Sequence, residues 1–96
     1  MAAKYIHPDE VVSPKQRWEL IKVLHDGGAG EYSIALGRWD NQVVLAMRWN
    51  GENESPIGNP QSRGLPTWFI VPENYRESIL VQLSKDIVAF VKKFFE

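Results

Sequence analysis

Two consecutive segments of alternating side-chain size constrain the fold of this chain most strongly. In residues 31–39 the large apolar side chains, such as Tyr32 and Leu36, alternate with small ones, which is the period of two that a β-strand shows. Residues 42–50 repeat this alternation, and Asp40-Asn41 between the segments favours a tight turn. The pattern predicts an antiparallel hairpin with one packed face and one open face.

The segments on either side of this hairpin supply two more strands. Residues 17–26 carry apolar side chains on both parities and lead into a glycine-rich turn. Residues 67–71 are rich in β-branched and aromatic side chains. Residues 50–66 contain three glycines and three prolines, so we expect a long connection without regular structure there. The predicted sheet is therefore antiparallel and four-stranded.

The last part of the chain is predicted to form one long helix from about Pro72 to Phe95. Its apolar side chains recur every three or four residues, but they cover about 200° of the helix surface, whereas one sheet covers roughly 100°. The excess predicts a second partner, and the simplest is the same helix of a second copy; the alternative is a terminal helix that is merely apolar and frayed. The expected dimer interface consists of Leu80, Val81, Ile87, Val88, Val91, Phe94 and Phe95.

Length and composition limit the class of protein. Ninety-six residues fit one α+β domain, with an irregular N-terminal arm over residues 1–16 and the sheet-plus-helix domain over residues 17–96. The counts of 11 Lys plus Arg and 12 Asp plus Glu give a net charge of −1, which excludes a strongly basic histone-like binder. The chain has no cysteine, which excludes disulfides and thiol chemistry. With neither a secretion signal nor a long apolar stretch, we expect a cytoplasmic protein without membrane contact.

Patterns typical of catalysis or metal binding are weak in this sequence. His7 and His25 have no local spacing that suggests a metal site, and two ordinary polar histidines explain them better. The segment Gly27-Gly28-Ala29-Gly30 lacks the lysine and hydroxyl residues of a phosphate-binding loop, so a turn explains it better. We therefore expect no enzyme activity, no cofactor and no metal.

Basic residues next to aromatic residues form the most informative chemical pattern. The pattern occurs as Arg38-Trp39, as Arg48-Trp49, and as Arg63 with Trp68. Aromatic rings stack on nucleic-acid bases for about 1–3 kcal/mol each, and guanidinium groups contact phosphates. The tryptophans could equally be core or interface residues. Parity favours the core for Trp49 and places Arg48 on the open face of the sheet.

The same region resembles the C-terminal domain of the eukaryotic transcriptional coactivator called positive cofactor four, and its bacterial single-stranded-DNA-binding relatives. That family has a strand, a short turn, a strand ending in Ile-Arg-aromatic, a loop, a basic-Gly-x-x-Leu strand and a Pro-headed helix. The corresponding segments here are Tyr32-Ser33-Ile34-Ala35-Leu36, Asp40-Asn41-Gln42, Val44-Leu45-Ala46-Met47-Arg48-Trp49, Ser62-Arg63-Gly64-Leu65 and Pro72-Glu73-Asn74-Tyr75. The resemblance covers about 80 of the 96 residues.

This resemblance implies a strongly curved four-stranded antiparallel sheet followed by one long C-terminal helix. It also implies a homodimer through the helices and single-stranded DNA lying across the sheets. Arg48 and Arg63 match basic positions of the family, whereas Lys22 and Arg38 are added because they lie on neighbouring strands. The nucleic-acid-binding residues expected on this basis are Lys22, Arg38, Trp39, Arg48, Arg63 and Trp68.

The charge of the predicted sheet departs from that family. Residues 17–72 contain five basic and six acidic side chains, whereas sheets that bind DNA are usually positive. We expect a dimeric protein that binds single-stranded DNA or RNA, in the class of transcription or DNA-maintenance accessory factors. Two alternatives remain open: a protein-interaction or regulatory module that binds an unidentified protein partner through Gly51–Pro66, and a small-ligand-binding dimer with a pocket between tryptophans.

Overall fold

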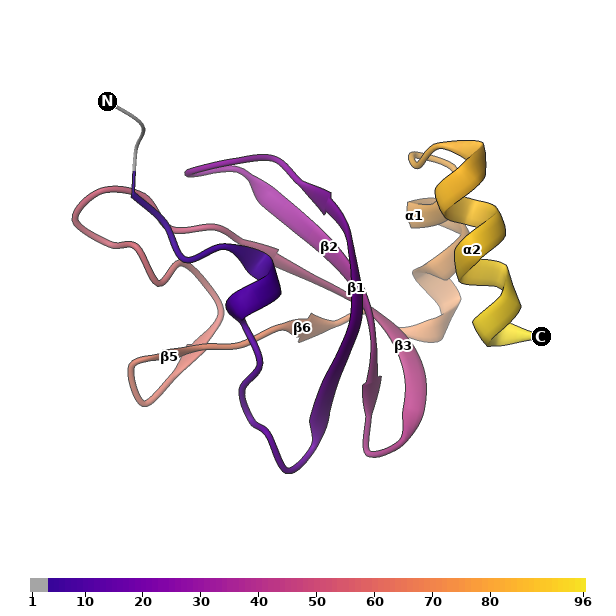
Figure 1. Cartoon of the computed structure of the whole chain (residues 1–96), viewed down its shortest axis with the longest axis horizontal. Helices are drawn as coiled ribbons and strands as arrows, with labels where there is room; N and C mark the ends of the chain where they lie inside the picture. The colour runs from indigo at the N-terminus through magenta and orange to yellow at the C-terminus, as the bar shows by residue number, and fades with distance from the viewer. Residues whose placement is uncertain (1–3) are drawn as a thin grey trace.

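The computed structural model describes residues 4–96 and contains one four-stranded antiparallel sheet with helices after it (Figure 1). The strands β1 (Trp18–Asp26), β2 (Tyr32–Trp39), β3 (Gln42–Trp49) and β6 (Phe69–Ile70) lie in the order β1-β2-β3-β6. The prediction of an α+β fold with four antiparallel strands is therefore confirmed.

The hairpin of β2 and β3 forms at the position that the alternation predicts. Its register pairs Leu36 with Leu45, so the large apolar side chains of the two strands meet on one face. Asp40 and Asn41 in the turn have φ values of 50° and 71°. These left-handed values suit a two-residue hairpin turn, and short polar side chains tolerate them.

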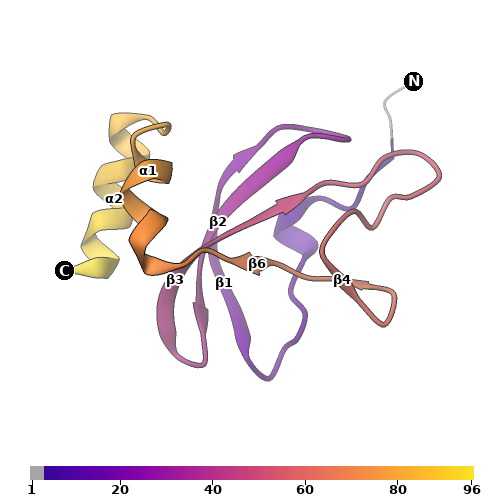
Figure 2. The ribbon, with the colours of Figure 1, turned by 180° about the vertical axis from the view of Figure 1, so that it is seen from behind.

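The connection after β3 contains a second, smaller hairpin. Strands β4 (Gln61–Ser62) and β5 (Leu65–Pro66) pair antiparallel, and Arg63 and Gly64 between them have positive φ values. Figure 2 shows this hairpin at the end of the molecule that is far from the helices. The expectation of a connection without regular structure is therefore wrong here, since glycine and proline mark turns without excluding two-residue strands.

The C-terminal region forms two short helices, so the prediction of one long helix is wrong. After a 3-10 turn (Glu73–Tyr75), α1 (Arg76–Leu80) ends at a break, and α2 (Lys85–Phe95) begins beyond it. Both helices lie on the same side of the sheet (Figures 1 and 2). Among residues 4–96, no helix has the length and apolar character that a membrane crossing requires.

Ser84 explains why a new helix begins after the break. It has extended backbone geometry, and its hydroxyl oxygen accepts a hydrogen bond from the Ile87 N–H at 3.3 Å. A serine in this N-cap position satisfies one of the N–H groups that the first turn of a helix leaves free. The apolar repeat continues across the break, which is why periodicity alone predicts a continuous helix.

Most side chains expected at a dimer interface lie against the sheet of the same chain. Leu80 and Val91 are buried in an apolar cluster with Leu36 of the sheet. Four others are partly buried and pack against that cluster: Ile87, Val88, Phe94 and Phe95. Val81, in contrast, is 73% exposed. Because the break lets two short helical faces meet one sheet, the wide apolar arc does not require a second copy.

The second face of the sheet is also covered, so the expectation of an open face is wrong. The N-terminal segment carries η1 (Pro8–Glu10) and lies on the side opposite to the helices (Figure 1). Val11 is fully buried there, in a cluster with Trp18 and Trp68. The indole N–H of Trp68 donates a hydrogen bond to the Val11 carbonyl at 2.8 Å. Residues 4–16 therefore share a core with the strands.

A polar network fastens this N-terminal segment to the end of β1. The Asp26 carboxylate accepts hydrogen bonds from the Gly28 N–H at 2.9 Å, the Tyr5 hydroxyl at 3.0 Å and the Asn50 amide at 3.1 Å. Burial by itself raises the pKa of Asp26, but these hydrogen bonds outweigh burial and hold the pKa below its usual value. The ionised carboxylate thus joins the N-terminal segment, β1 and the residue after β3.

Replacing Ser84 with alanine tests the origin of the helix break. We expect Ser84→Ala to lower the free energy of unfolding by about 0.5–2 kcal/mol, because the first turn of α2 loses its cap. The exposed Ser78 within α1 is the matched control, and Ser78→Ala should change the stability by less than about 0.5 kcal/mol. Urea unfolding measures both; equal losses in the two variants would contradict a capping role for Ser84.

Candidate functional site

Three strands carry exposed aromatic side chains on the sheet face that the helices cover. Tyr32 begins β2, Trp49 ends β3 and Phe69 begins β6, and these side chains are 37%, 58% and 57% exposed. Tyr32 and Trp49 share the parity of the buried Leu36 and Leu45, which places them on the face of the helices. Their exposure shows that the two short helices do not reach this end of the strands.

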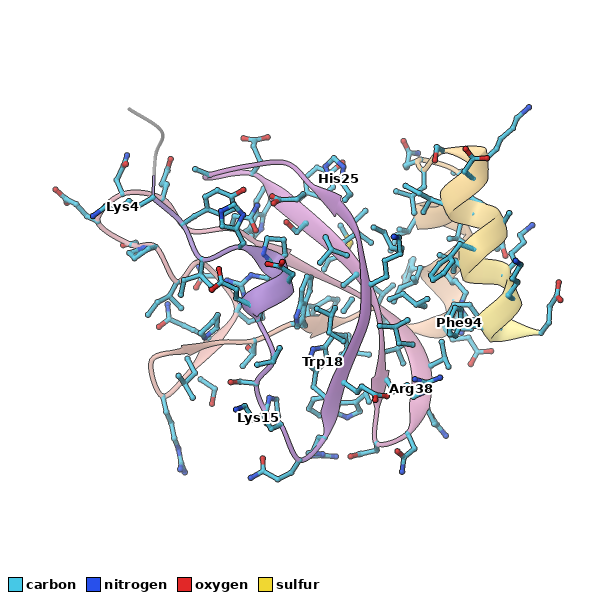
Figure 3. All side chains as sticks on the ribbon, viewed as in Figure 1. Lys4, Lys15, Trp18, His25, Arg38 and Phe94 are labelled. Atoms are coloured by element: carbon cyan, nitrogen blue, oxygen red, sulfur yellow. The ribbon has the colours of Figure 1, made fainter. Side chains whose placement is uncertain are left out.

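The exposed rings belong to one row across the sheet. Tyr32 and Trp49 are paired in register, and their ring centroids are 6.3 Å apart in an edge-to-face arrangement. His25 lies at the end of β1 (Figure 3), with its ring 4.9 Å from that of Tyr32. Phe69 pairs with Met47, two residues before Trp49. Each of the four strands therefore contributes one ring to this aromatic row of His25, Tyr32, Trp49 and Phe69.

Three rings of the aromatic row, those of Tyr32, Trp49 and Phe69, border a groove of about 770 Å³, which we call the aromatic groove. Its lining residues are Tyr32, Met47, Arg48, Trp49, Asn59, Pro60, Gln61 and Phe69. Asn59 lies directly opposite Trp49: the Trp49 N–H donates to the Asn59 carbonyl at 2.7 Å, and the Asn59 N–H donates to the Trp49 carbonyl at 3.0 Å. The loop after β3 therefore returns along that strand and forms the second wall of the groove.

Gly58 allows the loop to approach β3 this closely. Its φ is 73°, and a Cβ atom at this position would clash with the Trp49 carbonyl oxygen and lie 2.6 Å from the Gly51 nitrogen. Both the left-handed backbone and the lack of space favour glycine. The sequence Gly58-Asn59 thus sets the position of the groove wall.

The guanidinium of Arg48 holds the same loop in place. Arg48 is 3% exposed, its Nη1 donates to the carbonyls of Pro60 and Thr67, and its Nη2 donates to the carbonyl of Ile57. Burial lowers the pKa of Arg48 below its usual value. Parity correctly places Arg48 on the face away from the helices, but the expectation that this face is open is wrong. Its guanidinium binds loop carbonyls where the sequence predicts a phosphate contact.

Two of the expected basic residues lie between the sheet and α2. The Nζ atom of Lys22 is 5.5 Å from the Phe90 ring, and the Cζ atom of Arg38 is 6.0 Å from the Phe94 ring. Figure 3 shows Arg38 on the sheet and Phe94 on the side of α2 that points toward the sheet. Arg38 also pairs with Glu19 at 2.9 Å. Neither cation borders the aromatic groove.

The two tryptophans expected to stack bases lie on the opposite face of the sheet. Trp68 is buried, with its ring 5.9 Å from that of Trp18. Trp39 is half-buried in the same cluster, and the Arg17 guanidinium lies 4.7 Å from its ring centre. The residues predicted for nucleic-acid binding are therefore spread over both faces and do not form one surface.

Arg63 and Trp49 lie closer to the aromatic groove. Arg63 is exposed in the β4–β5 turn, two positions after the groove residue Gln61. Trp49 is exposed, so the prediction of a core position for it is wrong. Tyr32 and Asn59 were not predicted as site residues. The sequence does contain a signal for Tyr32. The hairpin register places Tyr32 opposite Trp49 at the ends of the two strands, and a helix shorter than the strands leaves both side chains exposed.

The aromatic groove combines flat rings with side-chain amides. Among residues 4–96, no carboxylate lines it, and the guanidinium of its one basic residue, Arg48, is bound to loop carbonyls. The Nε2 of Gln61 donates to the Gly58 carbonyl at 3.1 Å, so its Oε1 can accept a further hydrogen bond. Asn59 is exposed and offers both a donor and an acceptor. Such a lining suits a flat ligand with polar edges. In the described part of the chain, no three potential metal ligands lie together.

Comparison with known proteins finds no matching family model, no matching curated protein and no matching solved structure. The resemblance to single-stranded-DNA-binding domains therefore stays an expectation.

Replacing Arg48 with lysine tests its role as the anchor of the loop. We expect Arg48→Lys to lower the free energy of unfolding by about 2–4 kcal/mol, because one ammonium group cannot satisfy the carbonyls of Ile57, Pro60 and Thr67 together. Arg63→Lys makes the same change at an exposed position and should cost less than about 0.5 kcal/mol. Denaturant unfolding of the two variants gives the comparison, and a similar small effect at both positions would argue against the anchor.

Proposed function

We propose that this protein binds single-stranded nucleic acid in the aromatic groove. The observation that carries the proposal is the row of exposed rings on adjacent strands, with Tyr32, Trp49 and Phe69 each open to solvent. Neighbouring strands lie about 4.8 Å apart, so bases of an extended strand can meet successive rings. In a duplex the faces of the bases are covered by their neighbours, and the rings would therefore select unpaired strands.

Stacking rather than charge should supply most of the affinity. No carboxylate from the described part of the chain lines the groove, and the exposed Arg63 lies two positions after Gln61. The net charge of −1 provides no general attraction to phosphate. One or two phosphate contacts would reduce the affinity only about three- to sevenfold between roughly 50 and 200 mM salt. This weak salt dependence distinguishes a stacking groove from a basic nucleic-acid-binding surface.

An apolar segment of a partner polypeptide is the second candidate occupant. In its favour, three rings and Met47 make most of the groove lining apolar. Bulky side chains of a partner protein bind in pockets of this kind. Gly51–Pro66, the loop expected to mediate protein contacts, also supplies one wall. Binding of a polypeptide at these rings, without any binding of an oligonucleotide, would identify this occupant.

The contribution of the rings can be measured with fluorescein-labelled mixed-sequence strands of about 12 nucleotides, as DNA and as RNA. Trp49→Ala should weaken binding about 5- to 150-fold, because one stacked base is worth about 1–3 kcal/mol. Fluorescence anisotropy at about 50 mM salt reports the affinity.

Tyr75→Ala is the control for this experiment, because Tyr75 is an exposed aromatic residue outside the groove lining. It should leave the affinity unchanged. Failure of the wild-type protein to bind either strand would refute nucleic-acid binding, and an equal loss in the Tyr75 and Trp49 variants would refute the aromatic groove as the binding site.

We also propose that two copies associate through the surface where α1 and α2 meet, a smaller interface than the one expected from the sequence. A hollow of about 380 Å³ lies there, bordered by Glu77, Leu80, Val81, Leu83, Lys85, Val88, Ala89 and Lys92. Val81 is largely exposed, and burying a side chain of this size gains about 1.5–3 kcal/mol. In a two-fold arrangement Glu77 of one copy can face a lysine of the other, which makes the surface self-complementary.

The mass in solution tests this dimer. We expect twice the chain mass of 11.0 kDa for the wild-type protein, and the single-chain mass for Val81→Glu, because a buried carboxylate would oppose association. Leu65→Glu changes an equally apolar side chain that is exposed on the β4–β5 hairpin and should leave the dimer intact. Light scattering over a range of concentrations decides, and a wild-type monomer at all of them would exclude the dimer.

A further inference from the structure

The sheet ends at two edge strands, and the edge of β6 offers unpaired backbone groups beside an exposed aromatic ring. The strand order β1-β2-β3-β6 leaves β1 and β6 each with one neighbour. We propose that β6 accepts an extended segment of a partner polypeptide as a further strand of the sheet. Binding of this kind joins two chains through their backbones, and it is independent of nucleic-acid binding in the aromatic groove.

The pairing of β6 with β3 determines which backbone groups face outward. Phe69 is in register with β3, and the Val71 N–H donates to the Leu45 carbonyl at 2.9 Å. Because successive residues of a strand direct their N–H and C=O groups to opposite sides, those of Trp68 and Ile70 point away from β3. In the described part of the chain, no other segment donates or accepts a hydrogen bond at these groups. Two donors and two acceptors are therefore free, with the spacing that the backbone of another strand matches.

The two edges of the sheet differ in how they are protected. Two register shifts interrupt β1, and its charged side chains Glu19 and Lys22 are exposed. Bulges and charged side chains keep an edge strand from pairing with another chain. β6 has neither of these features: its Phe69 side chain is 57% exposed and its Ile70 side chain is half-buried. The apolar edge of β6 is therefore the one that can accept a strand.

Prolines on both sides of β6 limit the occupant to a short segment. Pro66 and Pro72 have no N–H, so the outward donors are confined to residues 67–71. An antiparallel strand added here would place one of its side chains beside the Phe69 ring, and an aromatic or β-branched side chain would gain most from this contact. We therefore expect an extended partner segment about as long as residues 67–71, with an aromatic or β-branched residue at its centre.

A second copy of this chain fits the edge less well than a different polypeptide. If two copies of β6 paired about Phe69, Pro66 of each copy would lie opposite Pro72 of the other, and neither proline could donate a hydrogen bond. The proposed dimer already uses one two-fold contact through the helices. A second contact of this kind would link the dimers into open-ended chains. The partner is therefore a different polypeptide.

Amide hydrogen exchange of the free protein, followed by ¹H–¹⁵N NMR, tests whether the edge is open. The Ile70 N–H should exchange at least about tenfold faster than the N–H groups of Phe69 and Val71, which face β3. Equal protection of Ile70 and Phe69 in dilute protein would overturn the inference. Protection of Ile70 that appears only as the protein concentration rises would also overturn it, because a second copy would then occupy the edge.

The partner chemistry can be tested with a phage-displayed library of random peptides about seven residues long, selected for binding to the wild-type protein. Synthetic versions of the enriched peptides should slow the exchange of the Ile70 N–H at least about tenfold. N-methylation of the peptide residues that pair with β6 should weaken binding about 2- to 12-fold for each hydrogen bond lost. The same change at the intervening residues should have little effect.

Ile70→Pro removes the outward N–H at a position where an edge strand tolerates proline, and it should weaken binding of these peptides by a similar factor. Ile70→Val keeps the N–H and is the matched control. Failure to enrich any peptide would overturn the inference, and so would enriched peptides that leave the exchange of Ile70 unchanged. Neither result would affect nucleic-acid binding, which the anisotropy measurements test separately. If Ile70→Pro does not fold, the comparison of N-methylated peptides still decides.

Discussion

The buried guanidinium of Arg48 joins the sheet to the long loop, and the aromatic groove depends on that connection. Its donors meet the carbonyls of Ile57, Pro60 and Thr67, so the loop is drawn against the end of β3. A buried charge is costly unless it is hydrogen-bonded, and these carbonyls lower that cost. Without the guanidinium, the groove wall at residues 59–61 would keep its backbone bridge to Trp49 but lose the hydrogen bonds that hold the loop on either side of that bridge.

The groove also depends on how little of the sheet the helices cover. The N-cap at Ser84 divides the C-terminal region into two short helices, which bury the middle of one sheet face and leave its end open. Tyr32, Trp49 and Phe69 therefore stay exposed, although they continue the apolar side of their strands. Exposing each large apolar side chain costs about 1.5–3 kcal/mol relative to burial. A cluster of exposed rings is for this reason a good indicator of a binding surface.

The sequence predicts the strands better than it predicts what covers them. Parity assigns Arg48 and Trp49 to opposite faces, as the structure has them, but it cannot show that a loop buries Arg48 or that the helices stop before Trp49. Periodicity does not predict the helix break, because Ile79, Leu83 and Ile87 keep the apolar spacing across it. The groove wall at residues 58–61 follows from pairing between β3 and a distant loop, for which the local sequence carries no signal.

The most direct test observes the indole N–H signals of the four tryptophans by ¹H–¹⁵N NMR during titration with an unlabelled single strand. Conservative Trp→Phe variants assign the signals. If bases stack in the aromatic groove, the signal of the exposed Trp49 should shift as the strand is added, while those of the buried Trp18 and Trp68 stay in place. A strand that shifts the signals of Trp39 and Trp68 and leaves Trp49 unchanged would contradict the account.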